Sequence, residues 1–160
     1  MIDSKIDHVG VVVPRLEPAL EQLSATFGLE WLPGGQGGAI LLMHRPNRDS
    51  DEQIRIRAAQ TVQYPRIEVV EAVPGTPWVL EGTGGFLLHH VAYWTSDLVN
   101  DSKQLSVTAP LQIYGVGRDG ASPKTFTYQL LDNGLLFELL EEQWSENGDR
   151  VVDQACVLEV

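Results

Sequence analysis

The pattern of apolar positions near the N-terminus predicts a strand with two different faces. Residues 6–13 are rich in valine, a composition that favours a β-strand. Pro14 would end this strand, because proline has no N–H to donate to a sheet. Side chains alternate between the faces of a strand, so one face carries His8, Gly10 and Val12 and the other carries three valines. We expect a helix to cover the valine face, while Gly10 beside His8 leaves room on the opposite face.

A helix is expected next. Apolar residues recur at spacings of four, three and four positions, which predicts an amphipathic helix over residues 17–27 that ends at Gly28. Its apolar stripe consists of Leu16, Leu20, Leu23 and Phe27. Further apolar segments predict strands at residues 39–43, 53–58 and 65–71.

The chain contains an internal repeat. Residues 6–23 and 88–105 superpose at an offset of 82 positions, with five identical residues that include the pair His8 and His90. Each copy consists of a histidine that opens a short strand, a turn and a helical run. Because the offset is about half the chain, it indicates two copies of one module rather than a solenoid.

A second sequence similarity relates the ends of the two copies. Residues 67–71 match residues 137–141 at an offset of 70 positions, and the match aligns Glu68 with Glu138. The module is therefore a histidine-bearing strand, a helix, further strands and a last strand that carries a glutamate. In the second copy we expect a first strand from His90, a helix over 99–105, and strands over 125–131 and 135–140 joined by an Asp-Asn-Gly turn.

These patterns divide the chain without separating it into independent domains. We expect one domain over residues 1–160, with modules at about 4–73 and 86–142, a proline- and glycine-rich linker at about 74–85, and a tail at 143–160 whose structure the sequence leaves open.

Composition narrows the class of protein. Hydrophobic residues make up 43% and charged residues 21% of the 160 residues, as in ordinary soluble globular proteins. The net charge of −11 argues against nucleic acid as a partner, because binding phosphates needs clustered lysine and arginine. Cys156 is the only cysteine, so an intrachain disulfide is excluded. The N-terminus lacks a secretory signal and no apolar run is long enough to cross a membrane, so we expect a cytoplasmic protein with no membrane partner.

The residues that can carry chemistry follow the repeat. His8, Glu68, His90 and Glu138 occupy equivalent places in two equivalent modules. If the modules pair about a pseudo-twofold axis, two imidazoles and two carboxylates converge, which is a donor set suited to a divalent first-row metal. A lone histidine on a strand is more often structural than a ligand, and the repeat partner is what favours the metal. A carboxylate flanked by aliphatic residues is costly to bury without a cation.

Other candidates have simpler interpretations. By strand parity His89 should face away from His90, and His44, near a polar loop, should be solvated. Glu71 and Glu141 lie three residues past the proposed ligands and should be surface carboxylates. Trp94 falls on the predicted site face, where it either walls a pocket or packs in the core.

The motifs that carry these residues resemble a known family. IDHVGVVVPRL and HHVAYWTSDL, together with RIEVVEAVPG and DNGLLFELLE, are similar to segments of the vicinal oxygen chelate superfamily, which includes glyoxalase I, methylmalonyl-CoA epimerase, extradiol dioxygenases and bleomycin-resistance proteins. The resemblance implies an α+β fold in which paired βαβββ modules form a curved mixed-sheet half-barrel. It also implies one divalent ion (Co, Ni, Zn, Mn or Fe) held by His8, Glu68, His90 and Glu138, and a homodimer.

The resemblance implies an enzyme. In that family a metal chelates substrate oxygens while a base moves a proton on the adjacent carbon. We therefore expect a metal-dependent isomerase or lyase, similar to methylmalonyl-CoA epimerase or glyoxalase I, with Glu138 as the base and Glu68 returning the proton from the opposite face. The expected substrate is a small molecule, such as an acyl-CoA or a thiol adduct. The alternatives are an extradiol-type dioxygenase, which the fourth ligand Glu68 disfavours, and a metal-free binding or resistance protein.

Overall fold

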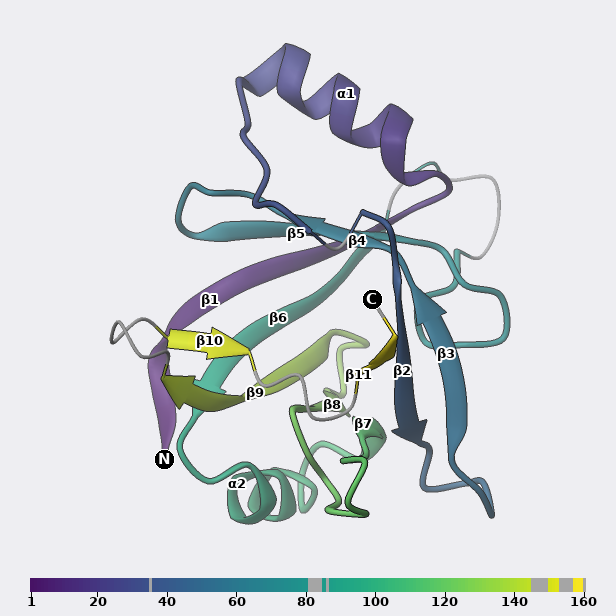
Figure 1. The fold of residues 1–160 in the computed structure, drawn as a ribbon. Helices are drawn as coiled ribbons and strands as arrows, with labels where there is room; N and C mark the ends of the chain where they lie inside the picture. Colours follow the sequence, from purple (N-terminus) through teal and green to yellow (C-terminus); the bar gives the residue numbers. More distant parts are fainter. Residues whose placement is uncertain (35, 81–84, 86, 145–149, 153–156, 160) are drawn as a thin grey trace.

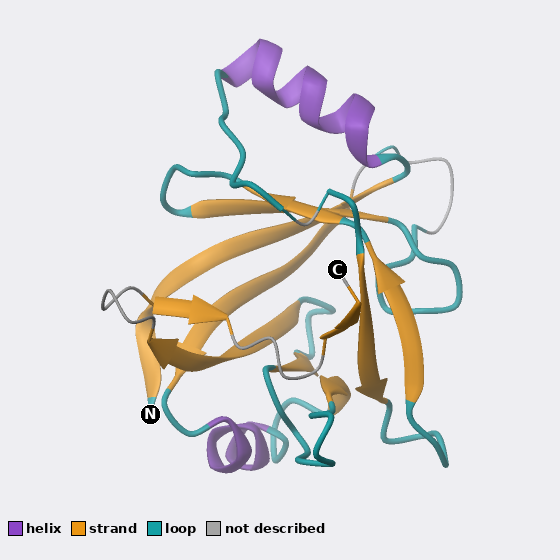
Figure 2. Ribbon diagram, viewed as in Figure 1, coloured by secondary structure: helices purple, strands orange, loops and turns teal. Residues whose placement is uncertain are grey.

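The computed structural model describes residues 1–34, 36–80, 85, 87–144, 150–152 and 157–159. Two helices lie outside a strongly curved sheet (Figures 1 and 2). The elements in chain order are β1 (Ile2–Val13), α1 (Leu16–Phe27), β2 (Ala39–His44), β3 (Glu52–Ile56), β4 (Ala58–Gln60), β5 (Arg66–Glu71), β6 (Leu87–Thr95), α2 (Leu98–Leu105), β7 (Leu111–Gly115), β8 (Phe126–Leu130), β9 (Leu136–Trp144), β10 (Arg150–Val152) and β11 (Val157–Glu159). Neither helix has the length and apolar character that spanning a bilayer requires.

The strands form one mixed sheet in the order β11-β2-β7-β8-β9-β6-β1-β5-β4, with β3 also paired to β2 and β10 to β9. Strands β1 and β6 are antiparallel neighbours at the centre, and each runs parallel to the last strand of its own module, β5 or β9. The expected α+β half-barrel is confirmed (Figure 1).

The prediction of one strand over residues 53–58 was wrong. The segment forms two strands separated by Arg57, of which β3 pairs with β2 and β4 pairs with β5. The break lets one stretch of chain turn from one side of the curved sheet to the other, so the sheet nearly closes on itself. A pairing change of this kind depends on distant strands, and no glycine or proline marks it in the sequence.

Two apolar clusters hold the fold. The outer cluster joins Val11 and Val13 to Leu16 and Leu20 of α1, so the valine face is covered by a helix, as expected. Phe27, the last residue of the predicted stripe, is 69% exposed, because the stripe is buried only over the first turns of α1. The inner cluster fills the concave side of the sheet and includes Val12 together with aromatic residues from β6 and β8.

Segments that the sequence left open also form strands. Residues 111–115 form β7, and the C-terminal tail contributes β10 and β11. Part of the predicted linker packs into the inner cluster through Trp78, which is buried. Residues 81–84 of that linker lie outside the described residues.

Candidate metal centre

Strands β1 and β6 place the two predicted histidines beside each other. His8 is the register partner of Ala92, and His90 is the register partner of Gly10. The ring of His90 crosses β1 directly over Gly10, where an added Cβ would lie only 1.9 Å from its Cε1 atom. The room predicted beside His8 is therefore occupied by the other histidine, and glycine is needed for this close approach.

A bulge precedes each histidine. The β1–β6 register shifts once between Ile6 and His8, which leaves Asp7 as the extra residue on β1. It shifts again between Gly10 and Val11, which leaves His89 as the extra residue on β6. A bulge re-aims side chains relative to strict alternation. Asp7 and His89 therefore lie beside the histidines that they precede.

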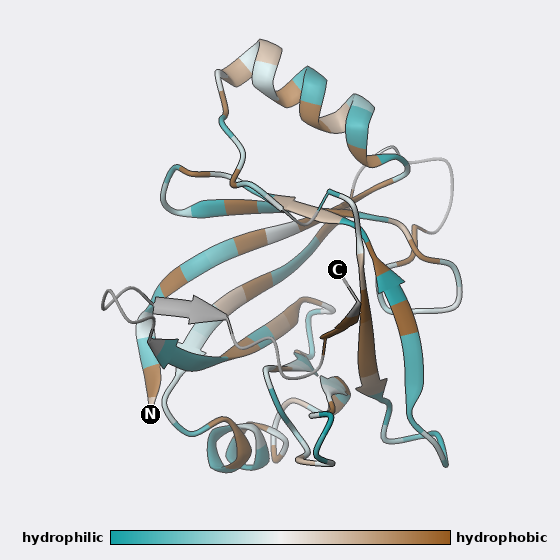
Figure 3. Ribbon diagram, viewed as in Figure 1, coloured by the Kyte–Doolittle hydropathy of each residue, from teal (hydrophilic) through white to brown (hydrophobic). Residues whose placement is uncertain are grey.

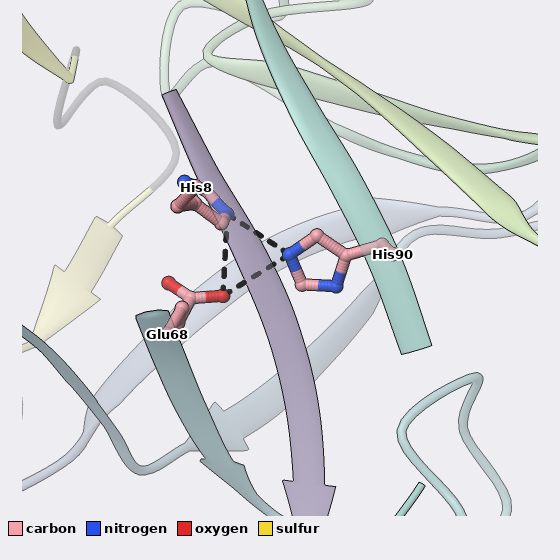
Figure 4. Close-up of side chains that lie close together, drawn as sticks. All are labelled: His8, Glu68 and His90. Atoms are coloured by element: carbon pink, nitrogen blue, oxygen red, sulfur yellow. Dashed lines mark hydrogen bonds and ion pairs between the residues drawn. The ribbon is translucent and has the colours of Figure 1, made fainter. Parts of the chain in front are cut away.

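The four predicted site residues converge on one point. His8 Nε2 lies 2.9 Å from His90 Nε2. Glu138 Oε2 lies 3.0 Å from His8 Nε2 and 3.3 Å from His90 Nε2. Glu68 Oε2 lies 3.7 Å and 3.3 Å from the same two nitrogens. Figure 4 shows His8, Glu68 and His90 pointing toward one another from three strands.

Asp7 determines which nitrogen of His8 is free. Asp7 Oδ2 lies 3.0 Å from His8 Nδ1, and Asp7 Oδ1 accepts a hydrogen bond from Trp94 Nε1 at 2.9 Å. Burial would raise the pKa of Asp7, but the hydrogen bond to His8, its charge and the contact with Trp94 lower it. An ionised carboxylate only accepts hydrogen bonds, so Nδ1 of His8 donates and Nε2 is the nitrogen that faces the convergence point.

A chain of hydrogen bonds shows in the same way that Nδ1 of His90 carries a proton. His89 Nε2 lies 2.9 Å from the carbonyl oxygen of Pro77, which only accepts, so His89 donates there. Burial and the neighbouring His90 lower the pKa of His89 to about 4, so this ring is neutral. Its Nδ1 therefore accepts from His90 Nδ1 at 2.9 Å, and His90 also turns its Nε2 inward. The prediction that His89 faces away was wrong, because the bulge breaks the parity on which it rested.

This donor set fits a divalent cation. Two imidazole nitrogens and two carboxylate oxygens meet, and Glu138 Oε2 is fully buried against both histidine nitrogens. Ligand bonds of about 2.1 Å at right angles place donor atoms about 3.0 Å apart, close to the spacing observed here. Burial would lower the pKa of His8, but the charge of Glu68 and the hydrogen bond to Asp7 raise it to about 10. Without a metal, a proton thus takes the place of the cation.

A cavity of about 380 Å³ opens onto this centre. Its walls are mainly apolar, and His8, Glu68 and Glu138 reach into it together with Gln60, Thr125 and Tyr128. Gln60 Nε2 donates to Glu68 Oε1 at 3.0 Å and so leaves Oε2 of Glu68 facing the histidines. Burial and the charges of Glu138 and Glu68 raise the pKa of Tyr128 well above its usual value, so its hydroxyl stays protonated.

The remaining candidates lie apart from the centre. His44 pairs with Asp51 through Nδ1 at 2.9 Å. Glu71 accepts from Arg57 and from the backbone N–H of Leu16, and Glu141 accepts from Lys124. Trp94 packs in the inner cluster, and its link to the site runs through Asp7.

Sequence reasoning missed four residues that shape the site. Asp7 and His89 carried a usable signal, because each directly precedes a histidine of the repeat. Gln60 and Tyr128 carried none, since only the curvature of the sheet brings them to the cavity.

Comparisons with known proteins agree with the fold. A family model described as glyoxalase/bleomycin resistance protein/dioxygenase superfamily matches residues 7–108. No protein among the curated sequences matches the chain.

Several solved structures have a similar fold. Methylmalonyl-CoA epimerase from Mycobacterium tuberculosis superposes with a TM-score of 0.54 at 21% identity, over 88% of this chain and 92% of that one. A variant of the Streptomyces coelicolor epimerase in complex with 2-nitronate-propionyl-CoA gives 0.55 at 20% identity, over 86% and 96%. A hypothetical protein from Bacillus halodurans gives 0.54 at 17% identity, over 89% and 98%. At these identities the similarity demonstrates only the fold, and the activity has to be argued from the site.

Proposed function

Since this chain belongs to the glyoxalase/bleomycin resistance protein/dioxygenase superfamily, we propose that it is a metal-dependent isomerase or lyase that moves a proton on a carbon next to a carbonyl group. The observation that carries the proposal is the convergence of two imidazole Nε2 atoms and two carboxylate oxygens at the wall of a cavity. A metal-free binding pocket would have no use for such a set.

One divalent ion, Co, Ni, Zn, Mn or Fe, would be held by His8, Glu68, His90 and Glu138. When bound, the ion would supply positive charge that withdraws electrons from a substrate carbonyl and makes the adjacent C–H more acidic. The apolar cavity walls would exclude water from that carbon and strengthen the electrostatic interactions there.

The carboxylates would move the proton. Strand β5 lies on one side of the β1–β6 pair and β9 on the other, so Glu68 and Glu138 approach the histidines from opposite sides. Glu138, whose buried Oε2 faces both histidine nitrogens, would take the proton. Glu68, held by Gln60, would give a second proton, drawn from solvent, to the opposite face, which inverts the carbon; Glu138 would then release its own proton to solvent. A lyase would instead use the same abstraction to expel a group from the next carbon.

Candidate substrates are acyl-CoA thioesters and thiol adducts, because a similar epimerase binds an acyl-CoA analogue. The homodimer expected from the resemblance stays a prediction, to be checked by light scattering.

The test is proton exchange in deuterated water. Purified protein should contain about one divalent ion per chain, and His8→Ala or His90→Ala should remove most of it. With CoA thioesters and thiohemiacetals as substrates, deuterium should enter the carbon next to the carbonyl. Glu138→Gln should abolish this exchange and bind metal far better than His90→Ala, because an amide still ligates but cannot accept the proton.

Glu141→Gln is the matched control, since this glutamate lies on the same strand and accepts from Lys124 and from the backbone N–H of Thr125 rather than facing the two histidines. Exchange that survives Glu138→Gln would contradict the assigned base. Oxygen consumption without exchange would favour a dioxygenase, and tight ligand binding by metal-free protein would favour a binding protein.

A further inference from the structure

The C-terminal strand fills a gap in the half-barrel. One edge of β2 is covered by β3. On the other edge β7 pairs only with Met43 and His44, while β11 pairs further back, with Val157 opposite Leu41. Strand β11 thus occupies the part of the edge that β7 leaves open. Figure 1 shows it beside β2, facing the concave side of the sheet.

This strand contributes to the cavity that opens onto the metal centre. Val157 is buried and lines the cavity together with its partner Leu41. Leu158, the next residue, is half-buried and does not line the cavity. Side chains alternate along a strand, so the tail presents one face to the cavity and one away from it. Figure 3 shows that most of β2 and part of the adjoining β11 are hydrophobic.

The tail lies outside both repeats. The solved structures described above are matched over 92–98% of their length, but only 86–89% of this chain is matched. Part of this chain therefore has no counterpart in them. Residues 143–160 follow the second module, so β11 lies outside the two repeated modules.

Beyond the metal centre, the described walls of the cavity carry no basic side chain. Among the lining residues that the structure describes there is neither lysine nor arginine. Apart from the site residues, its polar groups are the neutral Gln60, Thr125 and Tyr128. A charged substituent in contact with these walls would lose its hydration without gaining an ion pair, and this loss costs free energy.

We propose that β11 is a wall of the substrate cavity and that Val157 limits the size of an uncharged, apolar substituent carried next to the chelating oxygens. This rests on the proposed function, because the oxygens of the substrate are assumed to meet the metal centre. The substrate class is thus a carbonyl acid or thioester with a short alkyl or aryl group on the reacting side.

The experiment is calorimetric titration of the Co-loaded full chain with straight-chain 2-oxo acids of increasing length. Affinity should rise about fourfold for each added methylene, as burying one CH₂ predicts, until the chain meets β11, and then fall. Val157→Ala should move this limit to longer chains and Val157→Phe to shorter ones. Leu158→Ala, on the other face, is the matched control. A 2-oxo acid that ends in a second carboxylate should bind at least tenfold more weakly than the alkyl acid of the same length.

An unchanged length limit in both Val157 variants, or equal binding of the dicarboxylate, would overturn the inference. If the protein takes up no cobalt, or binds no 2-oxo acid when loaded, the proposed function fails instead. In that case the role of β11 as a cavity wall is tested on metal-free protein with the hydrophobic dye bis-ANS. A chain that ends at Val152 should open the cavity and increase dye fluorescence severalfold, and Val157→Ala, which keeps the strand, should increase it less. Unchanged fluorescence in both would show that β11 is no wall.

Discussion

Replacing Gly10 by alanine should abolish high-affinity metal binding while leaving the protein folded. A Cβ at this position would lie 1.9 Å from Cε1, 2.2 Å from Nδ1 and 2.3 Å from Nε2 of His90. Ordinary contact begins at about 3.4 Å, so the imidazole must retreat by about 1.5 Å. Metal–ligand distances tolerate deviations of only about 0.2 Å, so His90 would cease to be a ligand.

The size of the effect follows from the ligand count. Perturbing a residue that only supports a ligand costs about 10–100-fold in metal affinity, and loss of one of four ligands should cost at least the upper end of that range. The strand itself does not require glycine, since Gly10 has no positive φ. Crowding a packed site costs about 1–3 kcal/mol, which most folded proteins survive.

The assay is competition for cobalt against a chromophoric chelator, with circular dichroism as the check on folding. Gly37→Ala is the control, because a Cβ there would meet nothing within 4 Å. A folded Gly10→Ala protein that binds cobalt within about threefold of wild type would refute the reasoning, since His90 could then not be a ligand in the position described.

Further outcomes follow from the groups around the histidines. Asp7→Asn should weaken metal binding about 10–100-fold, because the carboxylate that orients His8 is lost; chelator competition measures this. His89→Phe preserves an aromatic ring beside Trp78 but leaves Nδ1–H of His90 without its acceptor, and it should weaken binding similarly, whereas His89→Gln should lose less. Because the pKa of His8 without metal is about 10, metal binding at pH 7 should release a proton, and affinity should rise as the pH rises toward 10; calorimetry in buffers of different ionisation enthalpy counts that proton. Metal at 100 times its Kd should stabilise the fold by about 2.7 kcal/mol, seen as a higher Tm that a chelator reverses.

The sequence predicted the features that are repeated or local. Two fixed offsets in the sequence align His8 with His90 and Glu68 with Glu138. The structure places all four residues together. The valine face of β1 was predictable because alternation within one strand is a local property.

Features that depend on register between distant strands were not predictable. The orientation of His89 follows from a bulge that exists only in the β1–β6 pairing. The break at Arg57 and the tail strand β11 depend on which edges of β2 and β5 are open for pairing in the folded sheet. Residues 153–156 of the tail lie outside the described part of the chain.

The residues at the two bulges differ in charge, although the backbone around them is duplicated. Beside His8 the bulge residue is the anionic Asp7, and beside His90 it is a neutral imidazole that ends on the carbonyl of Pro77. A carboxylate partner makes His8 the more electron-rich donor of the two. A molecule with a carbonyl oxygen at one end and an oxyanion at the other therefore meets different potentials in its two orientations. The two modules have near-twofold symmetry, yet the centre between them can distinguish the carbonyl end of such a molecule from its oxyanion end.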